Sequence, residues 1–379
     1  MVGGTAMTFT AILVLHAAPF QLGALNAMRI VPALVMSLAA GAWVDRVRRR
    51  PILIGADLGR ALLLLTIPAA ALAGILHIEQ LYVVALIVSV LTLLFDVAYQ
   101  SYLPGLVGKR RVQEANSKLS ASAAVAEFGG FSLGGWLVQA LSAPLTVLVD
   151  AASFLVSAFS IGWIRKREDP PVRAARSSLW HEVLEGLRTV RANRLLRASA
   201  VAIGIQQLSS GIYGALVVLY MSQGLGFAPG ILGMIWAVGG VSSLVGALLA
   251  PRFSKRLGFG TAMTLGLGVF GVTQALVPIA SGASVASALL LVGGQLGDGF
   301  CTIYEINQVS LQQGLASRRL LGRVNATIRF LSLGAALAGA LIGGWLGEAV
   351  GVRPMLALGA IGTLGAAVVL AASPVRAHR

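Results

Sequence analysis

Long apolar runs, separated by short polar segments, follow one another along the whole chain. There are twelve such runs, and most have the ~17–25 residues needed to cross the ~30 Å hydrocarbon core of a bilayer. Backbone groups in lipid must be hydrogen-bonded within their own segment, and the runs are too long for barrel strands, so each run predicts a transmembrane helix. The predicted spans are 1–18, 20–40, 51–74, 80–102, 117–140, 143–164, 197–221, 228–250, 259–280, 284–306, 322–346 and 352–373.

Positive charge accumulates on one side of these spans. Of the 29 Lys and Arg residues, 26 lie in five interhelical loops and the C-terminal tail, all on the same side, whereas the opposite loops hold only Arg353. Cytoplasmic loops retain positive charge during insertion, so the basic side is cytoplasmic and both termini lie there. We therefore expect a multi-pass protein of the plasma membrane of a bacterial cell.

The overall composition agrees with a membrane protein and excludes several function classes. The 379 residues are 57% hydrophobic and only 11% charged, which is incompatible with a soluble surface. The net charge of +15 is placed periodically between spans, so we expect no nucleic-acid partner. The single cysteine, Cys301, excludes an intrachain disulfide and a cysteine-based metal cluster. The sequence has no His-Glu-x-x-His, Walker loop or paired histidine set, so neither an enzyme nor a bound metal or cofactor is expected.

A long polar segment divides the spans into six plus six. Residues 165–196 form a linker between a first half, 1–164, and a second half, 197–379. The stretch 178–197 has apolar residues at helical spacing and predicts a helix along the inner membrane surface, with arginines toward the lipid phosphates. Whether this helix only joins the halves or also regulates them stays open. Its apolar positions are Leu179, Val183, Leu187 and Val190, and its arginines are Arg188, Arg191 and Arg194.

The two halves look like copies of each other. A single offset of 209 residues aligns acidic, basic and glycine-rich positions of spans four and five with those of spans ten and eleven. So many matches at one offset favour duplication over shared apolar composition. The chain therefore predicts an all-α membrane protein of twelve helices in two pseudo-symmetric six-helix halves. The matching pairs are Asp96 with Glu305, Arg110 with Arg319, Asn116 with Asn325, and Gly130, Gly134, Gly135, Trp136 and Leu137 with Gly339, Gly343, Gly344, Trp345 and Leu346.

The loop after the second span carries a motif. Residues 41–50 read Gly-Ala-Trp-Val-Asp-Arg-Val-Arg-Arg-Arg, with a glycine that starts the turn and an Asp-Arg pair before a basic cluster. This loop resembles the signature between spans two and three of the major facilitator superfamily, whose parallel repeats enclose a central site near the bilayer midplane. The resemblance extends over nearly the whole chain. Residues 102–116 and 150–154 are similar to the enterobactin-exporter-like and macrolide-efflux-like branch.

The resemblance implies an inner gate in this loop. In the superfamily the acid of the signature caps the eleventh helix and the bases pair across the inner gate, so Asp45 would be the gate acid. Arg46, Arg49 and Arg50 would be its partners. An anion at a helix N-terminus gains roughly 0.3–1 kcal/mol, small enough to break in each cycle. The bases also set topology, and both roles hold together. The equivalent second-half loop, 246–256, keeps the glycine and the bases but lacks the acid, which predicts an asymmetric gate.

Glycines recur at close spacing in spans five and eleven. The segment 130–135 resembles the Gly-Pro-x-x-Gly-Gly motif of drug and proton antiporters, with Phe131 in place of the proline. Small residues at this spacing let helices approach closely, so helix packing is an equal alternative to an export-specific role. The glycines assigned to helix packing are Gly130, Gly134, Gly135, Gly339, Gly343 and Gly344.

Ionisable residues inside the spans are functional candidates, because a charge at mid-bilayer costs at least ~2.5–3.5 kcal/mol. Glu127 lies about 15 Å from the inner end of span five at 1.5 Å per residue, close to the midplane. We interpret it as a proton-binding or cation-contacting group, with a buried structural hydrogen bond as the alternative. Arg29 in span two is its natural counter-ion or an anion-binding group.

Further acids and bases fit structural roles. Asp57 and Arg60 are three residues apart on span three, so helical geometry predicts a local ion pair. Asp96 and Glu305 recur at equivalent places in spans four and ten, which predicts a duplicated contact with basic loops. Asp150 in span six is interpreted as a helix-packing residue.

Other polar residues are placed to meet a substrate. Asp298 lies deep in span ten and is predicted to face the central cavity. Gln206, Gln207 and Tyr213 give span seven a polar stripe that either lines this cavity or bridges helices. These four residues join Glu127 and Arg29 as proton or substrate candidates.

These features favour a secondary transporter that works by alternating access. A cavity lined by apolar side chains with few charges suits amphipathic compounds. We therefore expect export of a small-molecule substrate such as a drug, macrolide or siderophore, driven by the proton gradient. We expect the protein to work as a monomer. Import or facilitated diffusion on the same fold is the first alternative. The second is a transport-inactive protein, since relatives carry a basic tail and a Gly-Asp pair early in helix one, whereas this chain starts inside that helix and its first helix is shortened.

Overall fold

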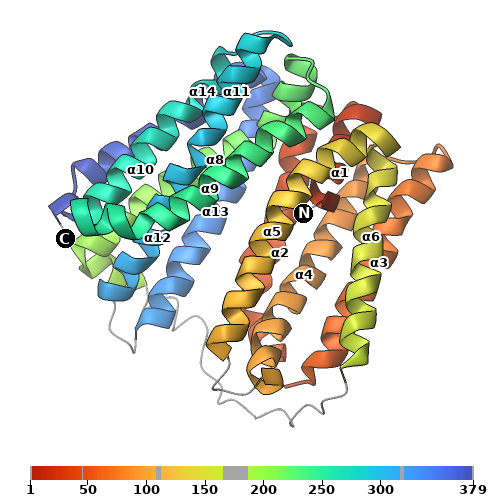
Figure 1. Ribbon diagram of the computed structural model, residues 1–379, viewed down its shortest axis with the longest axis horizontal. Helices are drawn as coiled ribbons and strands as arrows, with labels where there is room; N and C mark the ends of the chain where they lie inside the picture. The colour runs from red at the N-terminus through yellow and green to blue at the C-terminus, as the bar shows by residue number, and fades with distance from the viewer. Residues whose placement is uncertain (1, 45, 108–111, 165–186, 316–319, 378–379) are drawn as a thin grey trace. The chain divides into compact units, whose positions relative to one another are not determined.

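The computed structural model describes residues 2–44, 46–107, 112–164, 187–315 and 320–377 of the chain (Figure 1). These residues are almost entirely helical, and no β-strand occurs among them. Within these ranges, nine helical segments are long and apolar enough to cross a membrane, and Val2–Val14 is a shorter apolar one. The prediction of an all-helical, polytopic membrane protein is confirmed.

Each of the first six predicted spans coincides with a helix. Proline stands at the start of α2 and in the first turn of α6, where its missing N–H removes no helical hydrogen bond. The helices of this half are α1 (Val2–Phe9, followed by a π-helical turn over Thr10–Val14), α2 (Pro19–Val44), α3 (Arg49–Leu72), α4 (Ile78–Val107), α5 (Val112–Leu141) and α6 (Ala143–Trp163).

The second half follows the same plan, with one interrupted span. Residues 284–306 were predicted as the tenth span, but the helical segment there runs over Val285–Leu315 and is interrupted. The hydropathy pattern ended the span too early, because polar glutamines that are good helix formers continue the helix beyond the apolar run. The helices of this half are α8 (Arg194–Leu219, followed by a π-helical turn over Tyr220–Gly224), α9 (Pro229–Leu257), α10 (Phe259–Gln274), α11 (Val285–Leu296), α12 (Asp298–Leu315), α13 (Leu321–Ala349) and α14 (Val352–Ala371).

The first helix of each half ends in the same irregular turn. The Leu15 N–H donates to the Thr10 carbonyl at 3.2 Å, and the Leu225 N–H donates to the Tyr220 carbonyl at 2.8 Å. Each bond spans five residues, the spacing of a π-helix. The residues in the two turns differ, so the two halves share this backbone geometry without a matching sequence. It agrees with duplication of a six-helix unit.

The chain divides into two compact units, each described here by itself. The predicted linker residues 165–186 lie outside the described ranges. Of the predicted linker helix 178–197, residues 187–197 are described: 187–192 are helical, whereas 194–197 form the start of α8 after a break at Asn193. Val190 is buried with Leu196 of α8 and Val324 of α13. The first unit holds Met1–Ala17 and Leu25–Arg176, and the second holds Ala18–Ala24 and Ser177–Arg379.

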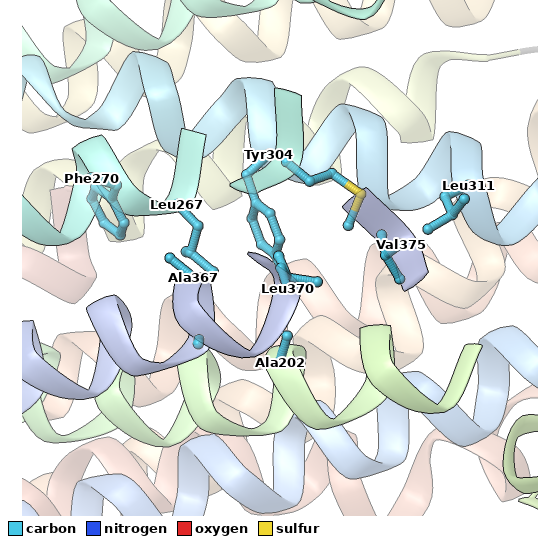
Figure 2. Close-up of a cluster of buried hydrophobic side chains, with 10 residues drawn as sticks. Ala202, Leu267, Phe270, Tyr304, Leu311, Ala367, Leu370 and Val375 are labelled. Atoms are coloured by element: carbon cyan, nitrogen blue, oxygen red, sulfur yellow. The ribbon is translucent and has the colours of Figure 1, made fainter. Parts of the chain in front are cut away.

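A cluster of buried hydrophobic side chains joins α8, α10, α12 and α14 in the second unit (Figure 2). Tyr304 of α12 lies between Leu267 and Leu370 in this view. Alanines complete the cluster, because small side chains let helices in a membrane approach closely. Its members are Ala202, Met263, Leu267, Phe270, Tyr304, Leu311, Ala366, Ala367, Leu370 and Val375.

The C-terminal segment folds back onto this cluster. After α14, a 3₁₀ turn over Pro374–Ala377 places Val375 in the cluster, where it is 0% exposed. The turn packs against the start of α10 at Gly260, where a Cβ atom would lie 1.7 Å from the Val375 carbonyl oxygen. The absence of a side chain at Gly260 therefore lets the C-terminal segment dock.

We expect Gly260→Ala to lower stability by about 1–3 kcal/mol, the usual cost of overpacking, because the new methyl must displace the backbone of the C-terminal turn. The measurement is the thermal unfolding midpoint of the purified protein in detergent. Gly268→Ala on the same helix is the control, since its Cβ would meet only the Ala367 Cβ at 3.9 Å, an ordinary contact. Equal midpoints for the two variants would mean that docking of the turn contributes nothing to stability.

Candidate functional site at an interrupted helix

The tenth span, Val285–Leu315 in the second unit, is interrupted near its middle. α11 ends at Leu296, Gly297 breaks the helix, and α12 begins at Asp298. The Gly297 N–H donates to the Gly294 carbonyl at 3.2 Å, a spacing of three residues rather than four. At 1.5 Å per residue, Asp298 lies about 20 Å from the start of α11, which is well inside a segment long enough to span the hydrocarbon region. The interruption therefore frees backbone groups at membrane depth.

A serine of α9 takes up the freed groups. Ser242 Oγ donates a hydrogen bond to the Leu296 carbonyl at 2.7 Å and accepts one from the Gly299 N–H at 3.0 Å. Such bonds matter because lipid offers no replacement partner. One hydroxyl thus bridges the end of α11 and the first turn of α12, and it holds the interruption in place.

The side-chain oxygens of Asp298 and Gln295 converge over a glycine of α9. A Cβ atom on Gly239 would lie 2.4 Å from Asp298 Oδ2 and 2.4 Å from Gln295 Oε1. The two oxygens are therefore at most twice 2.4 Å, or about 4.8 Å, apart. Hydrogen bonds from N–H to oxygen typically span about 2.7–3.2 Å, so one donor atom on the open side of this pair can bond to both oxygens. A larger residue at position 239 would fill the place where they meet.

Asp298 has no positive partner in the described ranges. No ion pair to Lys, Arg or His and no hydrogen-bond donor is found there for its half-buried carboxylate. Its electrostatic neighbours are Glu305 on α12 and Tyr213 on α8. Burial and the nearby charge of Glu305 both make an uncompensated negative charge at Asp298 costly. The site therefore favours a proton or a positively charged ligand.

One face of the interrupted helix is polar from the last turn of α11 along α12. Its residues recur every three or four positions, the spacing of a single helical face. They are half-buried or exposed, whereas Tyr304 and Leu311 of α12 are buried in the hydrophobic cluster. Carboxylates are costly against lipid, so this face is built for water or substrate. It comprises Gln295, Asp298, Cys301, Glu305 and Gln308.

Comparison with known proteins decides the family of this helical membrane protein. The family described as Major Facilitator Superfamily matches residues 1–338.

The chain belongs to the Major Facilitator Superfamily.

Several transporters resemble this chain along most of its length. The uncharacterised MFS-type transporter y4rN of Sinorhizobium fredii (strain NBRC 101917 / NGR234) is 27% identical over 341 residues, covering 86% of this chain and 80% of that protein. The multidrug efflux pump Tap of Mycolicibacterium fortuitum is 25% identical over 351 residues, covering 87% and 83%. The solved structure of the nucleoside transporter NupG matches with a TM-score of 0.77 and 14% identity over 97% of this chain and 93% of that one, a likeness of fold alone. The family and these relatives are transporters rather than enzymes.

The polar stripe predicted on the seventh span of this major facilitator chain divides into two parts. Gln206 is buried, and its Nε2 donates to Ser210 Oγ of the same helix at 3.0 Å. Gln207 and Tyr213 are half-buried, and Tyr213 lies within electrostatic range of Asp298. Gln206 thus has a helix-internal bond, while Tyr213 belongs to the surroundings of the site.

Two candidates of the first unit, Arg29 and Asp150, both contact α1. Arg29 Nη2 donates to the Gly4 carbonyl of α1 at 2.8 Å. Asp150 of α6 abuts the same helix, since a Cβ on Gly3 would lie 2.1 Å from Asp150 Oδ2. Glu127 falls within α5, but its side chain lies outside the described part of the structure. Pairing of Arg29 with Glu127 therefore stays a prediction.

Asp57 and Arg60 form an ion pair inside the first unit. Arg60 Nη2 donates to Asp57 Oδ1, and Arg60 Nη1 donates to Thr92 Oγ1 of α4 at 3.3 Å. The guanidinium lies over two rings, 4.5 Å from the centroid of Phe95 and 4.3 Å from that of Phe154. Cation–π attraction strengthens when the cation is desolvated, as here. The pair thus ties α3 to both α4 and α6.

Asp96 and Glu305 occupy exposed positions on α4 and α12. The Cys301 thiol donates to Glu305 Oε1 at 4.0 Å. The basic loop residues Arg110 and Arg319, expected near these acids, lie outside the described ranges. The duplicated contact with basic loops therefore stays a prediction.

The predicted inner gate is described in part. Asp45 lies outside the described residues, Arg46 is exposed and Arg49 is half-buried. Arg50 Nε donates to the Ile161 carbonyl in the last turn of α6 at 3.3 Å, and this carbonyl also accepts from the Ile164 N–H at 3.2 Å. Arg50 thus links α3 to α6 within the first unit, and the gate itself stays a prediction.

Glycines allow close helix contacts in both units. On α13, a Cβ on Gly339 would lie 2.1 Å from the Leu208 carbonyl oxygen, and one on Gly343 would lie 2.8 Å from the Ile212 Cα, both on α8. On α5, Gly134 meets the backbone and side chains of α1 at 3.9 Å. The remaining glycines assigned to packing, Gly130, Gly135 and Gly344, are buried.

Ser242, Gln295 and Gly239 were not anticipated from the sequence. One signal was present: residues 293–299 read Gly-Gly-Gln-Leu-Gly-Asp-Gly, a glycine-dense stretch with two polar side chains inside an apolar run. Glycine-interrupted spans point to binding sites in transporters. Ser242 carried no comparable signal, because its partners lie more than fifty residues away.

Proposed function

We propose that this chain is a secondary active transporter that exports amphipathic organic compounds, such as drugs, macrolides or siderophores, in exchange for protons. The observation that carries the proposal is the Asp298 carboxylate, a half-buried acid at membrane depth without a positive partner in the described ranges. Such a group binds either a proton or a positive charge, which is what an exchange of the two requires. The efflux pump Tap, a relative over most of the chain, supports the outward direction.

The scarcity of unpaired charge in the described spans supports an amphipathic substrate rather than a highly charged metabolite. We place the protein in the enterobactin-exporter-like and macrolide-efflux-like branch of the superfamily. In this proposal it works as a monomer by alternating access in a bacterial plasma membrane. Both termini lie in the cytoplasm, and the proton gradient is its energy source.

The test is uptake of ethidium, a fluorescent organic cation, into inverted membrane vesicles that carry the protein. We expect uptake that depends on an imposed proton gradient and stops on addition of a protonophore. Asp298→Asn is expected to lower this uptake at least about tenfold, because the neutral amide neither takes up a proton nor pairs with a cation. The initial rate of fluorescence change is the measurement.

The matched control is Glu348→Gln, which removes an exposed carboxylate from the outer end of α13 in the same unit. Its uptake is expected to equal that of the wild type. If neither the protonophore nor Asp298→Asn changes the uptake, transport in exchange for protons is ruled out. Accumulation in right-side-out vesicles instead would favour import.

A further inference from the structure

The interrupted helix presents two acceptor oxygens to one point. Asp298 Oδ2 comes from the first residue of α12, and Gln295 Oε1 comes from the last turn of α11. Both lie 2.4 Å from the place that a Cβ on Gly239 would occupy. The Ser242 hydroxyl holds the two helix ends together, so the two oxygens are kept in a fixed relation to each other. A ligand with two or more donors on one atom matches this arrangement.

A protonated amine fits these oxygens better than a metal ion does. Calcium takes about 6–8 oxygen ligands and magnesium demands about six in octahedral geometry. The site offers one carboxylate and one neutral amide oxygen, and no group of three His, Cys, Asp or Glu side chains suited to a metal occurs among the described residues. A primary ammonium group, by contrast, presents three N–H donors and one positive charge.

The neighbourhood also suits an organic cation. Tyr213 of α8 lies within electrostatic range of Asp298 and brings an aromatic ring to the region. Aromatic faces attract organic cations as well as burying apolar groups. Leu296, between the two oxygen-bearing residues, is 53% exposed and offers an apolar surface beside them.

We infer that Asp298 and Gln295, facing each other over Gly239, bind the protonated amine of an amphipathic organic cation. The inference rests on the proposed function for the transport of that compound, and it adds the substrate's class. Asp298 supplies the negative charge, Gln295 supplies a second acceptor, and Gly239, which has no side chain, lets both oxygens lie close together against α9.

The test is equilibrium binding of two matched probes to the purified full-length protein in detergent, without a proton gradient. Dansylcadaverine carries a primary amine that is charged at neutral pH, and its N-acetyl derivative keeps the fluorophore and the chain but has no charge. We expect the wild type to bind the charged probe at least about tenfold more tightly, since charge-assisted hydrogen bonds are the stronger ones. Asp298→Asn is expected to abolish this preference, and Gln295→Leu to reduce it.

The only cysteine of the chain gives a second readout. Cys301 is half-buried and lies one helical turn beyond Asp298. We expect the charged probe to slow the reaction of Cys301 with a maleimide in the wild type but not in Asp298→Asn. The same labelling, together with the thermal unfolding midpoint, reports whether each variant is folded. Glu348→Gln is the control and is expected to keep the wild-type preference.

Equal affinity of the wild type for the two probes overturns the inference, as does a preference that persists in Asp298→Asn. Amine binding without gradient-driven ethidium uptake would eliminate the proposed function and leave this site in place. Gradient-driven uptake without any preference for the charged probe would support the proposed function and overturn the amine-binding inference. The two proposals therefore fail separately.

Discussion

Arg60→Met is expected to destabilise the folded protein by about 3–5 kcal/mol, because it leaves the buried Asp57 carboxylate without its charge partner. The Arg60 and Asp57 side chains are 5% and 1% exposed, so solvent does not compensate for the loss. The variant also removes the guanidinium that lies over the rings of Phe95 and Phe154. The measurements are the thermal unfolding midpoint in detergent and the folded fraction recovered from membranes.

The double variant Asp57→Leu/Arg60→Met separates charge from packing. Replacing both members of a buried pair by apolar side chains is often neutral or stabilising, so we expect it to recover most of the lost stability. Lys118→Met is the control: Lys118 pairs with Glu114 on α5 at 2.7 Å, but these side chains are 75% and 61% exposed. Exposed pairs contribute little, and no measurable change is expected. A double variant as unstable as the single one would refute the argument from charge.

The ion pair also illustrates what a sequence reveals about this fold. The spacing of Asp57 and Arg60 on an apolar helix was enough to predict their pairing, because neighbours on one helix face are fixed by helical geometry alone. The contacts with Thr92, Phe95 and Phe154 join residues that are 32 or more positions apart. Such contacts depend on how helices pack, which no local pattern encodes.

The helices themselves were predictable for a related reason. A membrane span must be long, apolar and internally hydrogen-bonded, so hydropathy and loop charge locate it with little reference to its neighbours. Departures from the pattern arise where the backbone is irregular. The π-helical turns over Thr10–Val14 and Tyr220–Gly224 and the break at Gly297 lie inside apolar runs that look continuous.

Of the residues at the candidate site, only Asp298 and its neighbour Tyr213 were predicted from the sequence. Asp298 stood out because an acid in an apolar run is costly. Gln295 and Gly239 are recognisable as site residues only from their position next to Asp298 in the structure. The intramembrane charges also differ in kind once their partners are known. Asp57 and Arg60 neutralise each other within the first unit, and Asp298 meets no positive group in the described part of the second. An unneutralised acid is the one available to a moving ligand.

Ser242→Ala is expected to weaken both the stability of the protein and its binding of the charged probe, because it removes a hydrogen bond from the Leu296 carbonyl and another from the Gly299 N–H. Each backbone group left unsatisfied costs about 1–3 kcal/mol. The freed ends of α11 and α12 would also let the oxygens of Gln295 and Asp298 move apart. We therefore expect a lower unfolding midpoint, together with a loss of the preference for the charged probe over its acetylated form.

Ser243→Ala supplies the matched control for this hydroxyl. Ser243 is the next residue on α9, and within the described ranges its side chain makes no hydrogen bond, so removing its oxygen is expected to change neither quantity. A lower midpoint with an unchanged probe preference in Ser242→Ala would assign the serine to stability alone. An unchanged midpoint would mean that other groups satisfy the interruption, because backbone at this depth does not stay unpaired in lipid. If Ser242→Ala loses both stability and the probe preference while Ser243→Ala keeps both, the Ser242 hydrogen bonds hold Asp298 in the position that binds the probe.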